Sequence, residues 1–231
     1  MNKREEQRRR REEKQRAAEK SQGTRKLLSK FALYFLMPVF GLVVAYTYLN
    51  QAPTYSPVEV AENDHLRGDR EAPVTIVVYA DFQCPACATE NETMLRLWPE
   101  ISESSHLIFR HFPITTTHPH SWTASLYAEA AGRQGRFWEM HDALFQTQRL
   151  WSPLRDVEEE FDSYALGLNL DLEQLHADME DEALIAKIRA DQRGGNAAGV
   201  RGTPAVFIEG RQLARPSASR IREAIAEASA G

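Results

Sequence analysis

Apolar residues are spread unevenly along this chain of 231 residues, and their longest uninterrupted segment lies near the N-terminus. Phe31–Leu49 contains no charged residue. As a helix rising about 1.5 Å per residue, it nearly spans the roughly 30 Å hydrocarbon core of a membrane. Pro38 and Gly41 are compatible with this, because membrane helices tolerate both residue types. The pattern predicts one transmembrane helix at residues 31–49.

A cleaved signal peptide is the alternative interpretation of this segment. Its apolar region is usually shorter, about 7 to 15 residues, and ends in a small-x-small cleavage site. Thr47-Tyr48-Leu49 does not fit such a site. We therefore expect an uncleaved anchor.

The pattern after the apolar segment is first that of a tether and then that of a strand. Residues 50–72 are polar, contain two prolines and show no sustained period, which predicts a linker. Val74–Ala80 is a continuous β-branched and aromatic segment. Such a segment is typical of a central parallel strand that is buried on both faces.

A helix and a second strand are predicted next. Cys87, Met94 and Trp98 recur at helical spacing, and Pro99 is expected to end the helix. His106–Phe112 has the composition of a second strand.

Helical periodicity then dominates from about residue 118 to residue 195. Apolar positions recur at spacings of three and four in five successive segments, represented by Trp122, Phe137, Phe161, Leu175 and Ile188. Asp171 and Gln174 occupy capping-box positions before the fourth helix, and Gly194-Gly195 is expected to end the fifth. The pattern predicts a block of helices inserted between strands.

Strand character returns near the C-terminus. Ala205–Ile208 is followed by the turn Glu209-Gly210 and the short strand Arg211–Leu213, which together predict a hairpin. Ser217 is placed to cap a final helix. The predicted order is strand, helix, strand, helical block, strand, strand, helix, which indicates an α/β domain at residues 73–231.

Charge divides the chain in the same place as hydropathy. Residues 1–30 carry 12 lysines and arginines against five glutamates, a net charge of +7, whereas the remainder carries 16 against 28, a net charge of −12. Because basic residues favour the cytoplasmic side of a membrane, the sequence predicts a basic cytoplasmic arm and a C-terminal domain in the periplasm or outside the cell. The interspersed glutamates favour a solvated arm over nucleic-acid binding.

The chain has only two cysteines, Cys84 and Cys87, and they lie where the buried strand passes into the helix. Amide groups at a helix N-terminus stabilise an anion, so the Cys84 thiolate should be favoured. Cys84 would form a mixed disulfide with a substrate, and Cys87, on the inward face, would resolve it. Pro85 suits the first helical turn, because it has no N–H group to leave unpaired.

A Cys-x-x-Cys pair also occurs in zinc sites and in structural disulfides. Zinc would need two further ligands, for which His118 and His120 are the candidates. Pro119, between them, fits equally well in the first turn of a helix, so both histidines can be structural. The buried-strand context favours a redox pair, and we expect no metal and no cofactor.

Several separated segments resemble, in the same order, the DsbA-like thioredoxin-fold oxidoreductases, in particular their membrane-anchored or secreted bacterial branch. The similarity covers about residues 66–229, and its segments are VTIVVYADFQCPAC, IFRHFPI, HPHS, AGRQGRFWEMHDALF and GVRGTPAVFIEGR. The resemblance implies a thioredoxin fold with a helical insertion at about residues 118–195. It also implies that Pro204 is a cis-proline lying against the cysteines, and that the backbone of Thr203 binds an extended substrate segment.

Two departures from the family concern how the cysteines are tuned. Strongly oxidising relatives commonly have a histidine where this chain has Ala86. Thioredoxin and many relatives place a buried acid six positions before the first cysteine, where this chain has Val78. The resemblance therefore implies the reaction class and leaves its net direction open.

The resemblance implies disulfide exchange with cysteine-containing proteins outside the cytoplasm. Its membrane redox partner would be DsbB-like or vitamin-K-epoxide-reductase-like for an oxidant, or DsbD-like for a reductant. The alternative is a membrane-anchored chaperone or metal-handling accessory protein, in which removing Cys84 leaves function intact.

Overall fold

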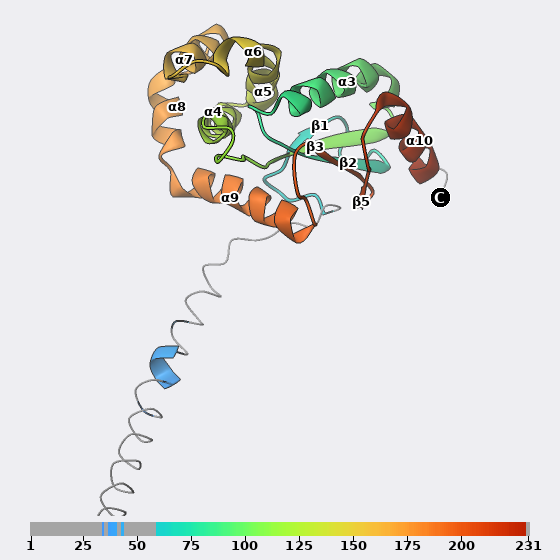
Figure 1. Ribbon diagram of the computed structural model, residues 1–231, viewed down its shortest axis with the longest axis horizontal. Coiled ribbons are helices and arrows are strands. Elements are labelled where there is room, and N and C mark those ends of the chain that lie inside the picture. The colour runs from blue at the N-terminus through green and yellow to red at the C-terminus, as the bar shows by residue number, and fades with distance from the viewer. Residues whose placement is uncertain (1–33, 35–36, 41–42, 44–58, 230–231) are drawn as a thin grey trace, which may run out of the picture. The chain divides into compact units, whose positions relative to one another are not determined.

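The computed structural model describes residues 34, 37–40, 43 and 59–229, within a chain made of two compact units, residues 1–51 and 52–231 (Figure 1). The predicted arm at 1–30 and most of the predicted transmembrane segment at 31–49 lie outside the described residues. Its described members expose apolar side chains, including Tyr34 and Phe40. No helix within the described residues is long and apolar enough to cross a membrane.

A five-stranded sheet with the order β1-β3-β2-β4-β5 organises residues 59–229. Its strands are β1 (His65–Arg67), β2 (Val74–Ala80), β3 (Ser105–His111), β4 (Ala205–Ile208) and β5 (Arg211–Gln212). The sheet is mixed, because β2 runs parallel to β3 and antiparallel to β4. All residues of β2 are buried and the strand is central in the sheet, so the predicted central strand is confirmed. The pairing of β4 with β5 confirms the predicted C-terminal hairpin.

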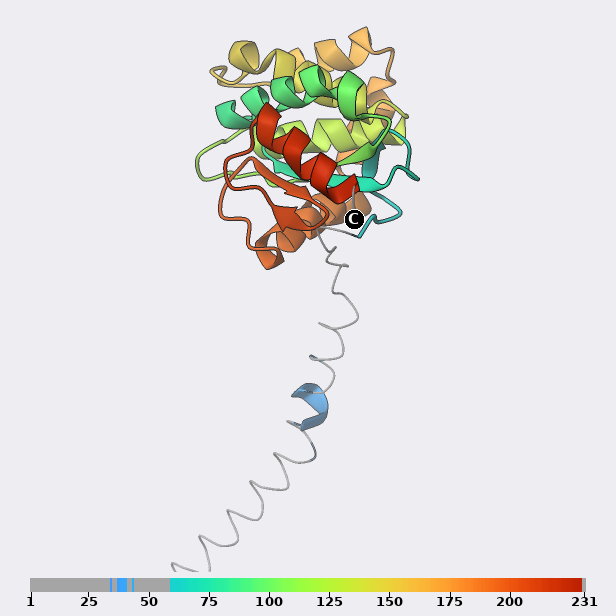
Figure 2. The same ribbon diagram turned by 90° about the vertical axis from the view of Figure 1, so that its right-hand side faces the viewer.

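Helices cover both faces of the sheet. On one face, Ile76 and Val78 pack in the main core with α3 (Pro85–Ile101) and α10 (Ala218–Ser229), which lie side by side in Figure 2. On the other face, Val77 and Tyr79 belong to a smaller core closed by the end of α9 (Glu182–Ala197). The alternation along β2 thus buries both faces, as its continuous apolar composition requires.

The helical block lies between β3 and β4, as predicted. Its members before α9 are α4 (Ser121–Arg133), α5 (Phe137–Gln146), α6 (Gln148–Trp151), α7 (Glu158–Gly167) and α8 (Leu172–Met179). At the start of α8, Asp171 accepts a hydrogen bond of 3.0 Å from the Gln174 amide, which confirms the predicted cap. The fold is therefore an α/β domain with an inserted helical subdomain.

Two predicted helix ends are wrong. Helix α3 continues past Pro99 to Ile101, because the proline removes only its own backbone donor and the Ser102 amide still bonds to the Trp98 carbonyl to close the last turn. Helix α9 continues through Gly194-Gly195, and a Cβ atom on Gly195 would lie 2.8 Å from the Phe112 ring and 2.9 Å from the Tyr79 ring. Gly195 therefore serves close packing of the helix against the sheet rather than helix termination.

Strand β1 lies within the segment that the sequence assigned to the linker. His65–Arg67 pairs antiparallel with β3, at the edge of the sheet. Its main-chain pairing makes these residues part of the folded domain.

Candidate active site

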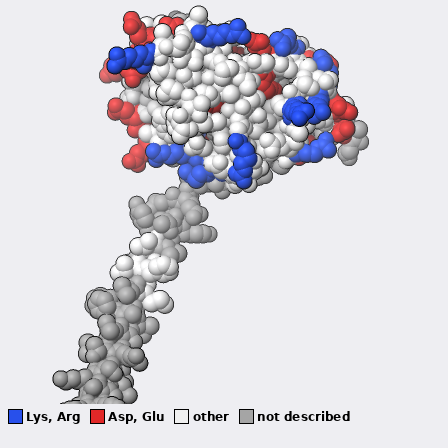
Figure 3. Space-filling model, in the orientation of Figure 1, with Lys and Arg blue, Asp and Glu red and all other residues white. Residues whose placement is uncertain are grey.

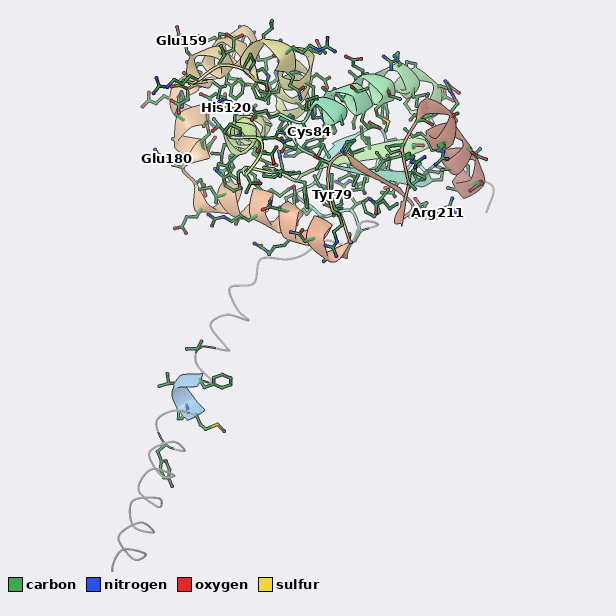
Figure 4. The ribbon with its side chains drawn as sticks, viewed as in Figure 1. Tyr79, Cys84, His120, Glu159, Glu180 and Arg211 are labelled. Carbon is green, nitrogen blue, oxygen red and sulfur yellow. The ribbon has the colours of Figure 1, made fainter. Side chains whose placement is uncertain are left out.

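Cys84 lies at the junction between the sheet and the helical block (Figure 4). It is the N-cap of α3, with an extended backbone (φ −74°, ψ 120°), and Pro85 is the first residue of the helix. The Cys84 carbonyl accepts hydrogen bonds of 3.0 Å from the Cys87 amide and 3.2 Å from the Ala88 amide. These bonds form the first turn and place both cysteines at the helix N-terminus, as predicted.

The surroundings of Cys84 favour its thiolate. A hydrogen bond from the Cys87 thiol makes the largest contribution, and it outweighs burial to lower the pKa of Cys84 to about 5. The backbone amides of Cys87 and Ala86 lower the pKa further, because amide groups at a helix N-terminus favour an anion. The predicted stabilisation by amides is therefore present, but the neighbouring thiol contributes more.

Cys87 is held in the opposite protonation state. Its side chain is only 1% exposed, and burial, followed by the neighbouring Cys84, raises its pKa well above the ordinary value. The Asp81 amide donates to the Cys87 sulfur at 3.5 Å. The pair thus combines an acidic thiol at the helix terminus with a neutral thiol on the inward face.

The loop before β4 closes over the cysteines. The Thr203–Pro204 peptide bond is cis, as the resemblance implied. The Cys84 thiol donates to the Thr203 carbonyl at 3.5 Å, which brings two segments far apart in sequence together. The Thr203 side chain also lies near both sulfurs and lowers the pKa of each cysteine through hydrogen bonding. Pro85, the residue after Cys84, is exposed.

Asp81 shapes the turn between β2 and α3. It is buried, with 1% of its surface exposed. Its carboxylate accepts hydrogen bonds of 2.8 Å each from the amides of Gln83 and Ile114, and its Oδ2 lies 2.8 Å from Nδ1 of His118. Asp81 therefore joins the turn before the cysteines to the segment that enters the helical block.

Two glutamines that sequence reasoning missed also fix the turn. Gln148, buried in α6, donates to the carbonyls of Phe82 at 2.7 Å and Cys84 at 2.9 Å. Gln83 accepts a 2.7 Å bond from the His120 amide and donates to Ser152. Gln83 lies in the segment VTIVVYADFQCPAC, but only the tertiary contacts of the two glutamines show this role. The helical block thus holds the redox turn through side-chain hydrogen bonds.

An open groove of about 540 Å³ runs beside the cysteines. It lies between α3 and the segment after β5, and its lining includes Ala86, Thr89, Pro204, Leu213 and Arg215. On the face shown in Figure 3, charged side chains gather toward the margins around a largely uncharged centre. The groove offers an extended peptide a surface next to Cys84.

The candidate zinc ligands do not face the cysteines. Nδ1 of His118 is held by Asp81, and Nε2 of His120 lies 2.9 Å from the Leu154 carbonyl. Among the described residues, His111, Glu129 and Asp191 form the one cluster with metal-ligand geometry, their ligand atoms lying within 4.8 Å of one another. The Lys187 ammonium lies 2.6 Å from Asp191 and 3.9 Å from Glu129, so it already supplies a positive charge there.

A family model for thioredoxin matches residues 60–227 of this chain. The chain belongs to the thioredoxin family. Curated relatives include part of the Na(+)/H(+) antiporter NhaA 1 of Salinispora arenicola, 38% identical over 151 residues, which are 65% of this chain and 22% of that protein. The Na(+)/H(+) antiporter NhaA of Herminiimonas arsenicoxydans is 34% identical over 168 residues, which are 73% of this chain and 26% of that protein. This thioredoxin-family chain therefore spans about a quarter of the curated relatives it matches.

Solved structures share the fold of this thioredoxin-family protein. A thioredoxin-like oxidoreductase from Silicibacter pomeroyi has a TM-score of 0.64 and 26% identity, covering 74% of this chain and 95% of that one. BdbD from Bacillus subtilis has a TM-score of 0.67 and 18% identity, and the match covers 78% of this chain and 100% of that one. Wolbachia pipientis alpha-DsbA1 has a TM-score of 0.65 and 20% identity, and the match covers 74% of this chain and 93% of that one. The predicted thioredoxin fold is confirmed, and the chain carries its Cys-x-x-Cys pair at the N-terminus of α3.

Proposed function

We propose that this chain donates disulfide bonds to cysteine-containing proteins outside the cytoplasm. The observation that carries the proposal is the pKa of Cys84, lowered to about 5 chiefly by the Cys87 thiol. A stabilised thiolate favours the reduced form of the pair, and a pair whose reduced form is favoured is an oxidant. Cys87, the amides of α3 and Thr203 supply this stabilisation although Ala86 replaces the histidine of strongly oxidising relatives.

The reaction begins with a substrate thiolate attacking Cys84 in the Cys84–Cys87 disulfide. A substrate–Cys84 disulfide forms, and the electron pair of the broken bond passes to Cys87, which takes up a proton. A second substrate thiolate then attacks the substrate sulfur, and Cys84 leaves as a thiolate. The substrate is oxidised by two electrons and the cysteine pair is reduced. The low pKa of Cys84 makes it a good leaving group in the last step.

The groove beside Cys84 supports a role in holding the substrate. In this proposal, Thr203 presents its backbone to an extended segment, while Pro204 and Pro85 border the attacked sulfur. Main-chain pairing would provide affinity without demanding one sequence, which suits an enzyme that acts on many unfolded chains.

The predicted anchor at residues 31–49 supports a place in the cytoplasmic membrane, with the redox domain on the outer side. The reduced pair then needs a membrane oxidase to regenerate its disulfide, and a DsbB-like or vitamin-K-epoxide-reductase-like protein is the expected partner. A DsbD-like reductant supply is the expected partner only if the chain runs in the opposite direction.

The redox potential tests the proposed direction. The full chain is equilibrated with glutathione buffers, and the state of Cys84 and Cys87 is measured by thiol labelling. We expect a potential near about −120 mV, the value for a strong disulfide donor. A potential near about −270 mV would identify a reductant and contradict the proposal. Failure to cycle reversibly would contradict disulfide exchange altogether.

The roles of the two cysteines are tested by trapping. Cys87→Ser should accumulate mixed disulfides with reduced substrate proteins, whereas Cys84→Ser should form none. Equal trapping by both variants would contradict these roles. A cellular function that survives in Cys84→Ser would favour the chaperone or accessory alternative.

A further inference from the structure

Disulfide exchange at this site requires a proton to move at Cys87. Each time the Cys84–Cys87 bond opens, the Cys87 sulfur must gain a proton, and each time it closes, the thiol must lose one. The side chain is 1% exposed, and burial raises its pKa, so solvent alone serves this transfer poorly. The chemistry therefore needs a proton-carrying group inside the protein.

A small cavity of about 20 Å³ lies against Cys87. It is walled by apolar side chains of β2, β3 and α3, with Phe145 of α5, and its polar lining comes from Cys87, Glu90, Asn91 and His141. Such a volume accommodates about one water molecule. Val78 of β2 also lines the cavity but has no proton to exchange.

Glu90 is the acidic group in this lining. It follows Cys87 by three residues on α3, a spacing that puts the two side chains on the same face with Cβ atoms about 5 to 6 Å apart. The side chain is 8% exposed, and its Oε1 atom is buried without a hydrogen-bond partner in the described part of the chain. A buried acceptor without a partner is costly, which argues that the carboxyl group is there for chemistry.

Glu90 also reaches the outside. Glu90 lines the open groove beside Pro204 as well as the small cavity beside Cys87. A proton taken from Cys87 can therefore leave toward solvent along the groove without crossing the core.

We propose that Glu90 is the proton donor and acceptor for Cys87 during disulfide exchange. This role rests on the proposed function. When the disulfide is attacked, Cys84–Cys87 breaks, the electron pair goes to Cys87, and the Glu90 carboxylic acid gives that sulfur its proton. When a mixed disulfide on Cys84 is resolved, the Glu90 carboxylate takes the Cys87 proton. The Cys87 thiolate then attacks Cys84, and the bond to the substrate sulfur breaks.

The titration of Glu90 fits this role. Burial raises its pKa to about 7, and a proton carrier works best when its pKa lies near the working pH. The other titratable or charged groups that line the cavity and groove are Cys87, His141 and Arg215. Burial lowers the pKa of His141 to about 4, and its Nδ1 lies 2.8 Å from Asp142, so it remains neutral near pH 7.

The test separates attack by Cys84 from resolution by Cys87. The reduced full chain reacts with dithiobis(nitrobenzoate), and stopped-flow absorbance follows release of the nitrothiobenzoate chromophore. Attack by Cys84 releases the first chromophore and leaves a mixed disulfide, and attack by Cys87 releases the second. Both rates are measured between about pH 5 and pH 9 in the wild type and in Glu90→Gln.

In the wild type we expect the second rate to show an inflection near pH 7, where Glu90 titrates. Glu90→Gln should lose that inflection and slow the second step about 10²-fold near pH 7, while the first step keeps its rate. Glu90→Met, also unable to carry a proton, should behave in the same way and serves if the glutamine variant folds poorly. Glu92→Gln, an exposed glutamate on the same helix, is the matched control and should change neither step.

The sign of the effect is decisive. If Glu90 were only an unfavourable negative charge, its removal would stabilise the Cys87 thiolate and accelerate resolution. A second step that is unchanged or faster in Glu90→Gln would therefore overturn the proposal. A wild-type chain that releases only one chromophore would instead overturn disulfide exchange itself.

Discussion

Two buried glutamates in this protein have opposite electrostatic surroundings. Glu129 of α4 lies within hydrogen-bond distance of His111 at 2.8 Å and His65 at 3.0 Å, with Lys187 at 3.9 Å. Burial opposes its ionisation, but Lys187 and then His65 outweigh burial and hold its pKa well below the ordinary value. For Glu90 of α3, burial alone raises the pKa to about 7.

The difference shows how to tell a buried glutamate that stabilises the fold from a buried glutamate that can take part in proton transfer. Glu129 belongs to a buried ion-pair cluster with Lys187 and Asp191, in which the Lys187 ammonium lies 3.9 Å from Glu129 and 2.6 Å from Asp191. Glu90 belongs to the redox site, and its Oε1 atom has no hydrogen-bond partner within the described residues. A carboxylate beside a buried cation stays ionised and helps to hold the fold, whereas a buried carboxyl group without a cation can exchange a proton near neutral pH.

Removing Lys187, the cation of the ion-pair cluster, should give the largest change in the free energy of unfolding. Lys187→Met leaves Glu129 and Asp191 buried without their shared positive charge, and breaking a buried pair in this way costs about 3 to 5 kcal/mol. Urea unfolding at neutral pH measures the loss. Arg211→Met, which breaks an exposed pair with Glu227, is the control and should change stability by less than about 0.5 kcal/mol. Equal losses in both variants would show that the cluster is not compensated as described.

Neutralising Glu90 should change stability in the opposite direction. The free carboxyl titrates near pH 4.5 and the folded one near pH 7, so the folded state binds the extra proton between these values. Stability contributed by this group is complete below about pH 4.5 and is lost as pH rises toward 7. Glu90→Gln should therefore raise the free energy of unfolding by up to about 3 kcal/mol at about pH 8 and by almost nothing at about pH 4.

Urea unfolding of the two proteins at both pH values measures this difference, with Glu92→Gln as the control. A Glu90→Gln variant that is less stable than the wild type at about pH 8 would mean that the carboxylate has a favourable partner, and the contrast with Glu129 would fail.

The sequence predicted those parts of the fold that have strong local signals. Val74–Ala80 is continuously apolar because both of its faces are buried, and Glu209-Gly210 has the left-handed backbone that a tight hairpin turn requires. Strand β1 escaped prediction because His65–Arg67 is too short to show a period and is defined by its pairing with β3. Gly195 was misinterpreted because its close contact with Phe112 is tertiary.

The same distinction holds for the site. Cys84, Cys87 and Pro204 were predicted from motifs, and the structure brings the Thr203–Pro204 segment against Cys84. The contact between Asp81 and His118 joins residues 37 positions apart, which no local pattern reveals. Glu90 did have a signal, because Cys87, Glu90 and Met94 share one helical face, but a lone acid in an amphipathic helix is ordinarily solvated.

Weakening the link between the helical block and the redox turn should give the smallest of these effects. Gln148→Met keeps a side chain of similar length but removes the donors to the carbonyls of Phe82 and Cys84. The Cys84 carbonyl retains its bonds from the amides of α3, so only the Phe82 carbonyl loses its partner. The free energy of unfolding, measured in urea, should fall by about 2 kcal/mol. Gln146→Met, at an exposed position two residues earlier, is the matched control. If Gln148→Met costs no more than its control, the helical block does not hold the turn through this side chain. The ion-pair cluster would then be the stronger of the two regions in stabilising the fold, and the redox turn would depend on α3, Asp81 and Gln83.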